Sequence, residues 1–474
     1  MAWILLLAIA LGVCGVAAVR VHRRRKACNR QPETPSLSKS LPPSQRAILP
    51  ELLSSSASKD LSKGSDNVLK LEADYRLADA STMLFSGFTV GEVRALGNFP
   101  DYAKLSGVRL PFPIDDFEVE KAVPRPYRPF RWPYHQTMGM NRPQDQKTLP
   151  WPYISEMSVR KALQKLDPDY WLELESSYRE RILQRQALYA EHGRRVVDAL
   201  PGSELGQKEL MEMVIQFLCA RYPRHFELRD RTFVNHLLGT EQHLDKVEPL
   251  RVLFNNVPED FAIVLRDEKT GRYLFRAGII CSAVGWSLGE KMGLSLSEIH
   301  KPVPDYKQKI AFSVDRFFSK LATSNPIQRA SWGLEIGQPL FLPSTDADFR
   351  QRETQNPSLA AQDVHLRVDW QTLRRLPLSG AVVFNFKALF TPITEFRNEP
   401  YIPSLILKIL NEGNEEIMKY KGTWHVQHVV KPTLEAYERF QVEQGLVEEN
   451  WNPETLKESP FFPGWERKYA DASR

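Results

Sequence analysis

The sequence predicts an α+β fold, in which helices flank an antiparallel sheet and an N-terminal transmembrane helix precedes the domain. Three observations support this prediction. Residues 260–286 contain two apolar runs around Asp-Glu-Lys-Thr-Gly-Arg, which is the pattern of a β-hairpin. Residues 167–200 place apolar residues at helical spacing behind an Asp-Pro start. The first residues form an uncharged, mostly apolar run that is long enough to cross a bilayer.

The remaining elements continue this mixture of helices and strands. Residues 203–222 predict a second helix, and residues 307–323 predict an amphipathic one. Residues 363–393 predict two strands around a turn at Leu378-Ser-Gly. Residues 401–422 predict a helix that closes the domain. Helices beside a small antiparallel sheet are the arrangement of an α+β domain.

The N-terminal leader predicts a membrane anchor. Its apolar run, AWILLLAIALGVCGVAAV, is followed by the positive charges of RVHRRRK, whereas a cleaved signal peptide carries such charges before the run. The positive-inside rule then places everything after residue 20 in the cytosol. A signal cleaved near Ala17-Ala18 is the alternative. We therefore expect a single-pass membrane protein whose body faces the cytosol, with the endoplasmic reticulum as its membrane.

Composition excludes several classes of protein. The chain has 474 residues, of which 42% are hydrophobic and 26% charged, so it can bury a large core. The net charge of +5 is mild and gathers near the N-terminus, which argues against a nucleic-acid partner. The four cysteines have no CxxC spacing, so neither a zinc site nor a disulfide framework is expected.

Common catalytic motifs are missing, and the histidines are scattered. The chain has no GxGxxG after a strand, no GxxxxGK[ST], no HExxH and no GxSxG. Only His425 and His428 lie close together, as HVQH, in a stretch that we predict to be a loop. His135 stands apart, because Trp132, Pro133, Tyr134, Met138 and Met140 could provide an apolar slot beside it. A neutral imidazole on a rigid mount is a good axial ligand for haem iron, although an ordinary loop histidine is the alternative.

The stretch LRVDWQTLRRLP, residues 366–377, is the second candidate. On a strand, Arg367, Asp369 and Gln371 point to one face while Val368 and Trp370 point to the other. A carboxylate that faces a buried cavity could hold a cationic amine. The alternative is an Arg367–Asp369 neighbour pair at a solvated face of the sheet.

Several segments in order across roughly residues 110–430 resemble the haem-dependent oxidative N-demethylase family, a former domain of unknown function with a fungal branch known as the HRQ family. They are PFRWPYHQTMGM, LRDRTFVNH, VPEDFAIVLRD, AGIICSAVGWSLGEKMGLSLSEIHKPVPDY, VDRFFSKL, PIQRASWGLEIGQPLF and LRVDWQTLRRLPLSGAVVFNFKALFTPI. The resemblance implies a PAS-like haem-binding domain. With the composition, it divides the chain into an anchor at 2–19, a basic and then Ser/Pro-rich linker at 20–68, a lead-in at 69–109, the demethylase-like domain at 110–435 and a C-terminal tail at 436–474.

The resemblance also implies site residues, a cofactor and a partner. The family's haem-iron ligand falls on His135, and its substrate-facing carboxylate falls on Asp369. Lys291, His300 and Arg329 are candidates for the haem propionates or the edge of the pocket, because carboxylates favour charge-assisted donors. The family oxidises a small secondary amine with dioxygen, releases formaldehyde and takes its electrons from NADPH through separate flavin and iron–sulfur subunits. We expect a separate reductase here as well, and a membrane-bound one would suit the predicted anchor.

One departure from the family pattern leaves alternatives open. The family has a Glu-Arg-Gln triplet before TLRRLP, whereas this chain has Asp369-Trp370-Gln371, which shortens the carboxylate's reach by one methylene. A larger or different substrate, or retention of haem without oxidase activity, fits this change equally well. A non-catalytic haem sensor or carrier is therefore the alternative function. A membrane-bound interaction scaffold without haem is the third.

Overall fold

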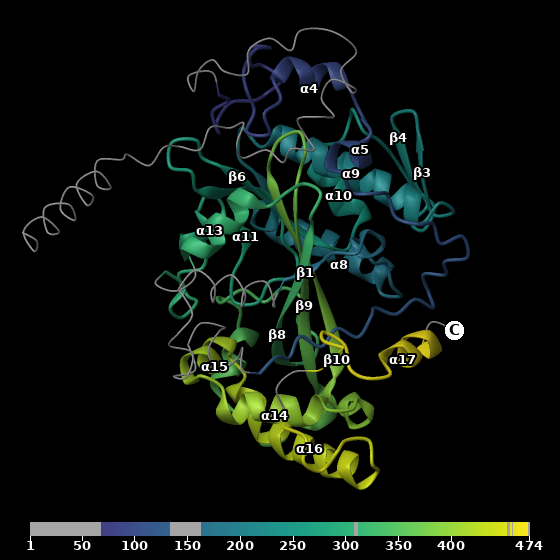
Figure 1. Cartoon of the computed structure of the whole chain (residues 1–474), viewed down its shortest axis with the longest axis vertical. Coiled ribbons are helices and arrows are strands. Elements are labelled where there is room, and N and C mark those ends of the chain that lie inside the picture. Colours follow the sequence, from purple (N-terminus) through teal and green to yellow (C-terminus); the bar gives the residue numbers. More distant parts are fainter. Residues whose placement is uncertain (1–67, 133–162, 308–310, 453–455, 457, 473–474) are drawn as a thin grey trace, which may run out of the picture. The chain divides into compact units, whose positions relative to one another are not determined.

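An antiparallel sheet is the centre of the described fold. The computed structural model describes residues 68–132, 163–307, 311–452, 456 and 458–472. Within these ranges, the larger sheet has seven strands in the order β1-β8-β9-β10-β6-β7-β2 (Figure 1). Its strands are β1 (Gln164–Lys165), β2 (Val197–Ala199), β6 (Asp260–Arg266), β7 (Tyr273–Ile279), β8 (Ile327–Ile336), β9 (Val364–Arg375) and β10 (Val382–Pro392).

Helices and a small second sheet surround this sheet. The second sheet has the order β3-β4-β5, with strands Phe226–Arg229, Thr232–Asn235 and Thr240–His243. The α-helices are α4 (Val90–Leu96), α5 (Tyr102–Ser106), α8 (Tyr178–His192), α9 (Glu204–Arg221), α10 (Pro249–Asn256), α11 (Leu288–Lys291), α12 (Leu296–Ile299), α13 (Ala311–Lys320), α14 (Ile402–Glu412), α15 (Glu415–Lys421), α16 (Trp424–Glu443) and α17 (Trp465–Ala472).

Both predicted strand pairs are confirmed. β6 pairs with β7, and β9 pairs with β10 in one unbroken register from Val382↔Arg375 to Pro392↔His365. Gly380 makes the second turn possible, since its φ of +71° favours glycine and an added Cβ would lie 2.8 Å from the ring of Phe85. The turn at Gly380 therefore fixes the register of the β9–β10 hairpin, whereas the β6–β7 pair contains a register shift between Ile263 and Val264.

Three helix predictions need correction. The helix predicted over 167–200 begins only at Tyr178, because the Asp167-Pro168 start opens a 3₁₀ turn instead and Asp167 accepts a hydrogen bond from the amide of Asp169. The helix predicted over 401–422 is divided into α14 and α15, and the side chain of Asn414 caps the second part. The HVQH stretch lies in α16, not in a loop, and that helix also contains Pro432.

The two faces of the larger sheet pack against different helices. One face contributes Trp332, Val368 and Trp370 to the main core, which also contains buried side chains of α8, α9, α10, α14 and α16. The opposite face contributes Leu373 and Phe386 to a second, smaller cluster with α11, α12 and α13. The alternation of side chains along each strand produces this division.

The predicted membrane-anchored architecture and location are corrected. The anchor predicted at residues 2–19 lies outside the described residues. Among the residues that the structure describes, none of the helices combines the length and apolar character that a membrane crossing requires. The described fold is a mixture of helices and antiparallel sheets, and it does not support the predicted transmembrane helix or a location in the endoplasmic reticulum membrane.

A buried ion pair joins the segment before β1 to the C-terminal region. The guanidinium of Arg128 donates to both carboxylate oxygens of Glu399, at 2.8 and 2.9 Å, and the two side chains are only 3% and 1% exposed. Lys468 of α17 contacts the same carboxylate at 2.6 Å. Burial alone would raise the pKa of Glu399, but the charges of Arg128 and Lys468 hold it below its ordinary value. The stabilisation is present at neutral pH and is lost as the pH falls through that lowered pKa.

Replacing Arg128 with Met should destabilise the fold strongly. The change leaves the Glu399 carboxylate buried with one partner fewer, and breaking a buried pair in this way costs about 3–5 kcal/mol. Urea unfolding of the full chain measures the loss.

A matched control is Lys408→Gln, which breaks a more exposed i,i+4 pair with Glu412 within α14. Such pairs contribute less than about 1 kcal/mol. Equal losses in the two variants would show that the buried pair does not hold these segments together.

Candidate functional site

Strands β8 and β9 place four polar side chains together on one face of the sheet. The register pairs Arg329 with Gln371 and Ser331 with Asp369. Residues two apart on a strand share a face, and directly opposite residues have Cβ atoms roughly 5 Å apart. Sequence positions separated by about 40 residues therefore form one polar strip. It lies on the face that packs against α11, α12 and α13.

An aromatic wall borders this polar strip. Phe386 of β10 lies opposite Gln371 and is 7% exposed. The ring of Trp286 lies 6.4 Å from that of Phe386, and the ring of Phe384 lies 5.6 Å from it. The Oε1 atom of Gln371 is buried and has no hydrogen-bond partner among the described residues. An aromatic surface thus meets a polar strip with hydrogen-bonding capacity that the described residues leave unused.

Asp369 is held by Arg367 on the same strand. The Arg367 side chain is 4% exposed, and its Nη2 lies 2.9 Å from the Asp369 carboxylate and also donates to the carbonyl of Ser282. Its Nε donates to the same carboxylate at 3.0 Å, and its Nη1 donates to the carbonyl of Pro339. The Asp369 side chain keeps 29% exposure. The neighbour pair weighed from the sequence is therefore confirmed, and one side of the carboxylate is still accessible.

Two predicted cations, Lys291 and Arg329, have no acidic partner among the described residues. The Lys291 ammonium donates only to the carbonyl of Ile299, at 3.3 Å. Arg329 is half-buried, and its side chain forms no hydrogen bond or ion pair with any described residue. Burial first, and then the charges of Arg329 and Lys291, lower the pKa of His300, so the three side chains occupy one electrostatic neighbourhood. Since Arg329 also belongs to the strip that contains Asp369, the structure brings together the four predicted site residues that it describes.

His300 is fixed in one tautomer. Its Nδ1 atom lies 2.7 Å from the carbonyl of Leu296, and since a carbonyl can only accept, Nδ1 carries the proton. The ring stacks on Tyr306 with centroids 4.7 Å apart and 9° between the planes. Burial is the main cause that lowers the pKa of His300. Nε2 is then an acceptor, so neutral His300 suits an iron ion better than a propionate.

Lys421 is a functional candidate that the sequence did not reveal. It ends α15, and its ammonium donates to the Ser331 hydroxyl at 3.2 Å and to the Trp332 carbonyl at 2.9 Å. Burial, followed by the nearby Arg329 charge, lowers the pKa of Lys421 to about 8, while Asp369 opposes that shift. Sequence position gives no signal here, because Lys421 and Ser331 are ninety positions apart.

Two histidine predictions have different outcomes. His135 lies outside the described residues, so its role as a ligand stays a prediction. The described residue nearest to it in the sequence is Trp132. In the HVQH pair, His425 contacts the carbonyl of Gly422 and His428 contacts that of Asn356. No group of three or more metal-ligating side chains occurs in the described part of the chain.

The chemistry of the site fits a planar cofactor that carries carboxylates. Lys291, Arg329 and Lys421 supply positive charge without a carboxylate of their own in the described ranges. Trp286 and Phe386 supply aromatic, apolar contact beside them, with ring planes 49° apart. These side chains have the chemistry that an anionic, aromatic group requires of a binding site.

A comparison with known protein families points to haem as this group. The chain matches the model of the family described as haem-dependent oxidative N-demethylase, alpha subunit-like, over residues 162–431. This range covers more than half of the chain, and the protein belongs to this family. The match does not distinguish the fungal HRQ branch. It includes Lys291, His300, Arg329 and Asp369, whereas His135 precedes it.

Replacing Lys421 with Met should flatten the alkaline pH dependence of stability. The pKa of Lys421 is about 8 in the folded protein and 10.5 in its ordinary state. Between these values the unfolded chain binds more protons, so the free energy of unfolding rises with pH. Urea unfolding across this window should show the rise in the parent protein and not in the variant.

Lys419, an exposed lysine in the same helix, provides the control. Lys419→Met should keep the rise. If Lys421→Met also kept the rise in the free energy of unfolding, Lys421 would be solvated in the folded parent protein.

Proposed function

We propose that this protein is the haem-binding component of an oxidative demethylation system, which acts on a small amine with dioxygen and external electrons. Membership of the demethylase family carries this proposal. The positive side chains beside the aromatic wall support it, because a porphyrin offers both carboxylates and a flat apolar surface. When bound, haem supplies dioxygen activation, which no amino-acid side chain provides.

The cations of the site would bind the propionates. Arg329 and Lys291 already share one electrostatic neighbourhood, and Lys421 lies within the influence of Arg329. Bonds between such cations and carboxylates are short and about twice as strong as neutral hydrogen bonds. These contacts would hold the carboxylates of the cofactor beside Arg329, Lys291 and Lys421.

Asp369 would orient the amine by charge. Its carboxylate faces the same side of the sheet as Arg329 and Gln371, and part of it is accessible. Arg367 holds the carboxylate in place through its own backbone contacts. Asp369 would therefore act by positioning a cationic nitrogen. Because Arg367 is already paired with this carboxylate, its positive charge would weaken the attraction between Asp369 and a simple amine.

Two histidines compete for the iron. The family resemblance favours His135, whereas the observed geometry favours His300, whose Nδ1–H is anchored to a carbonyl and whose Nε2 is left as an acceptor. Anchoring of one ring nitrogen is typical of metal-ligating histidines. We retain His135 as the proposed ligand and His300 as its rival.

Electrons would come from a separate protein. The chain contains no GxGxxG fingerprint after a strand and no CxxC spacing, so the sequence gives no sign of a flavin, NADPH or iron–sulfur module of its own. We propose NADPH as the source, with a flavin and iron–sulfur reductase as the carrier. A haem sensor or carrier is the alternative, and it would need neither the reductase nor Asp369.

The full chain, produced in haem-replete cells, should carry close to one haem per protein and show a Soret band. His135→Ala should lose that band if His135 holds the iron, while His243→Ala, which removes an exposed histidine, should keep it. Loss in His300→Ala alone would transfer the ligand role to His300. A folded, colourless parent protein that ignores added haemin would eliminate the haem function.

Asp369→Asn should keep haem but reduce amine-dependent formaldehyde release by roughly 100-fold, because misplacement of the reacting group costs that much. The assay supplies NADPH and a flavin/iron–sulfur reductase and screens small secondary amines. Asp363→Asn, which changes an exposed acid just before β9, is the control. Unchanged release in Asp369→Asn would remove this residue from the mechanism, and haem without release from any amine would favour the sensor.

A further inference from the structure

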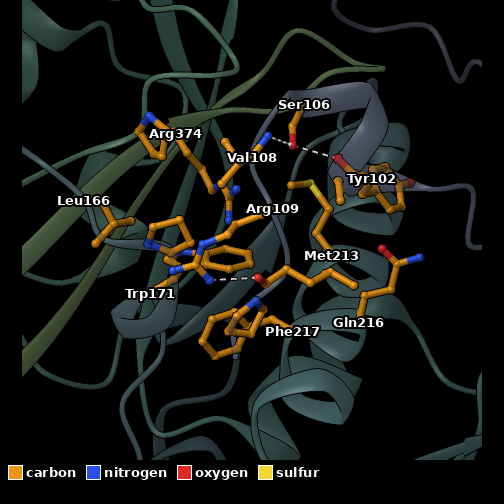
Figure 2. Close-up of a pocket in the computed structure, with 15 residues that line it drawn as sticks. Tyr102, Ser106, Val108, Arg109, Leu166, Trp171, Met213, Gln216, Phe217 and Arg374 are labelled. Carbon is orange, nitrogen blue, oxygen red and sulfur yellow. Dashed lines mark hydrogen bonds between the residues drawn. The ribbon is translucent and has the colours of Figure 1, made fainter. Parts of the chain in front are cut away.

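A cavity lies on the opposite face of β9, away from the proposed haem site. Figure 2 shows it between Arg374, Leu166 and Trp171 on one side and Tyr102, Met213 and Gln216 on the other. Arg374 follows Leu373 on β9, and Leu373 belongs to the face that packs against α11 and α12. The cavity is therefore separated from Asp369 and Arg329 by the sheet itself.

The side chain of Arg374 is a buried cation without a hydrogen-bond partner in the described part of the chain. The residue is only 5% exposed, and its Nε atom is buried without an acceptor. Its guanidinium lies 3.9 Å from the ring of Trp171, which adds a cation–π contact but no acceptor. Burial lowers the pKa of Arg374 to about 10, so the side chain is still charged at neutral pH. An isolated buried charge of this kind is costly.

Nearby carboxylates are already engaged elsewhere. Glu209 of α9 accepts bonds from the amide and the hydroxyl of Ser379, at 2.8 and 2.6 Å, and also from the amide of Leu378. Glu212 accepts from the hydroxyl of Tyr102 and pairs with Lys208. Neither forms an ion pair with Arg374 among the residues described. Glu209 acts on Arg374 only through its charge, which opposes the lowering of the Arg374 pKa by burial.

The other arginine of the cavity, Arg109, is neutralised. It pairs with Asp169 at 2.7 and 3.1 Å and lies 3.6 Å from Asp167. Asp167 and Asp169 are thus engaged with Arg109 and do not neutralise Arg374. Trp171 is a second donor of this kind, because its indole Nε1–H is also buried and has no acceptor among the residues that the structure describes. Two residues that line the same cavity thus carry donors without a described acceptor, and donors cannot satisfy one another.

We propose that this cavity binds one small monovalent anion, of the size of chloride or formate, between Arg374 and the indole N–H of Trp171. A negatively charged hydrogen-bond acceptor would satisfy both groups. The cavity has a volume of about 30 Å³, which holds one or two water-sized groups and no larger ligand. Leu166, Val108 and Met213 form an apolar part of its lining, which strengthens the attraction between the anion and Arg374, while Ser106, Gln216 and the paired Arg109 form a polar part.

Anion-dependent stability of the full chain tests this site. Thermal unfolding is measured in sodium gluconate, whose anion is too large for the cavity, and sodium chloride or sodium formate then replaces it at constant ionic strength. A ligand that binds only the folded state raises the unfolding midpoint in a saturable manner. We expect such a rise with chloride and formate, and no rise with the larger phosphate ion.

Two variants assign the effect to the cavity. Arg374→Met should weaken the apparent affinity for chloride roughly tenfold or more, the loss expected for one charge-assisted hydrogen bond. Trp171→Phe keeps the ring, removes the N–H and should weaken it less. The control Arg109→Gln/Asp169→Asn removes a paired cation together with its acid and should leave the affinity unchanged.

A second measurement decides the matter if Arg374→Met does not fold. The ³⁵Cl resonance of a chloride solution should broaden in the presence of the parent protein, and formate should reverse the broadening. Trp171→Phe should reduce it. Chloride and gluconate giving equal midpoints without broadening would mean that the cavity holds only water. An anion effect that persists unchanged in both variants would place the anion at the haem iron or the surface and overturn the proposal.

Discussion

The pairing of β9 with β8 on one side and with β10 on the other is the interaction on which the site depends. These strands have ten to twelve residues each, and their registers run without interruption. A shift of one residue in β9 would turn Asp369 and Gln371 toward the main core and bring Trp370 to the other face. The alternation of one strand therefore decides which side chains face the proposed cofactor and which face the Arg374 cavity.

Local signals predicted the strands well and the helix boundaries less well. The β6–β7 and β9–β10 hairpins follow from apolar runs around glycine-containing turns, which are short-range features. The start of α8 was misplaced because burial of Trp171 and Leu172, a tertiary effect, holds the chain away from helical form after the Asp-Pro pair. The HVQH stretch was mistaken for a loop because Pro432 suggested a break, whereas α16 continues through it.

The candidate site could be predicted only in part. Motif positions singled out Arg329, His300 and Asp369, and the pairing of Arg367 with Asp369 followed from their spacing on a strand. Lys421 could not be found in this way, since only the three-dimensional fold brings the end of α15 to Ser331. Nor could the tautomer of His300 be predicted, because it depends on the carbonyl of Leu296 in the preceding turn.

The contact of Lys468 and Arg128 with Glu399 has a consequence for synthesis. Glu399 follows Arg128 by 271 positions, and both Lys468 and Pro460, whose carbonyl accepts a hydrogen bond from the amide of Arg128, come later still. A nascent chain therefore exposes the Arg128 side of this junction before its partners have been made. Because domains generally fold as units, the junction closes only when these later residues have left the ribosome.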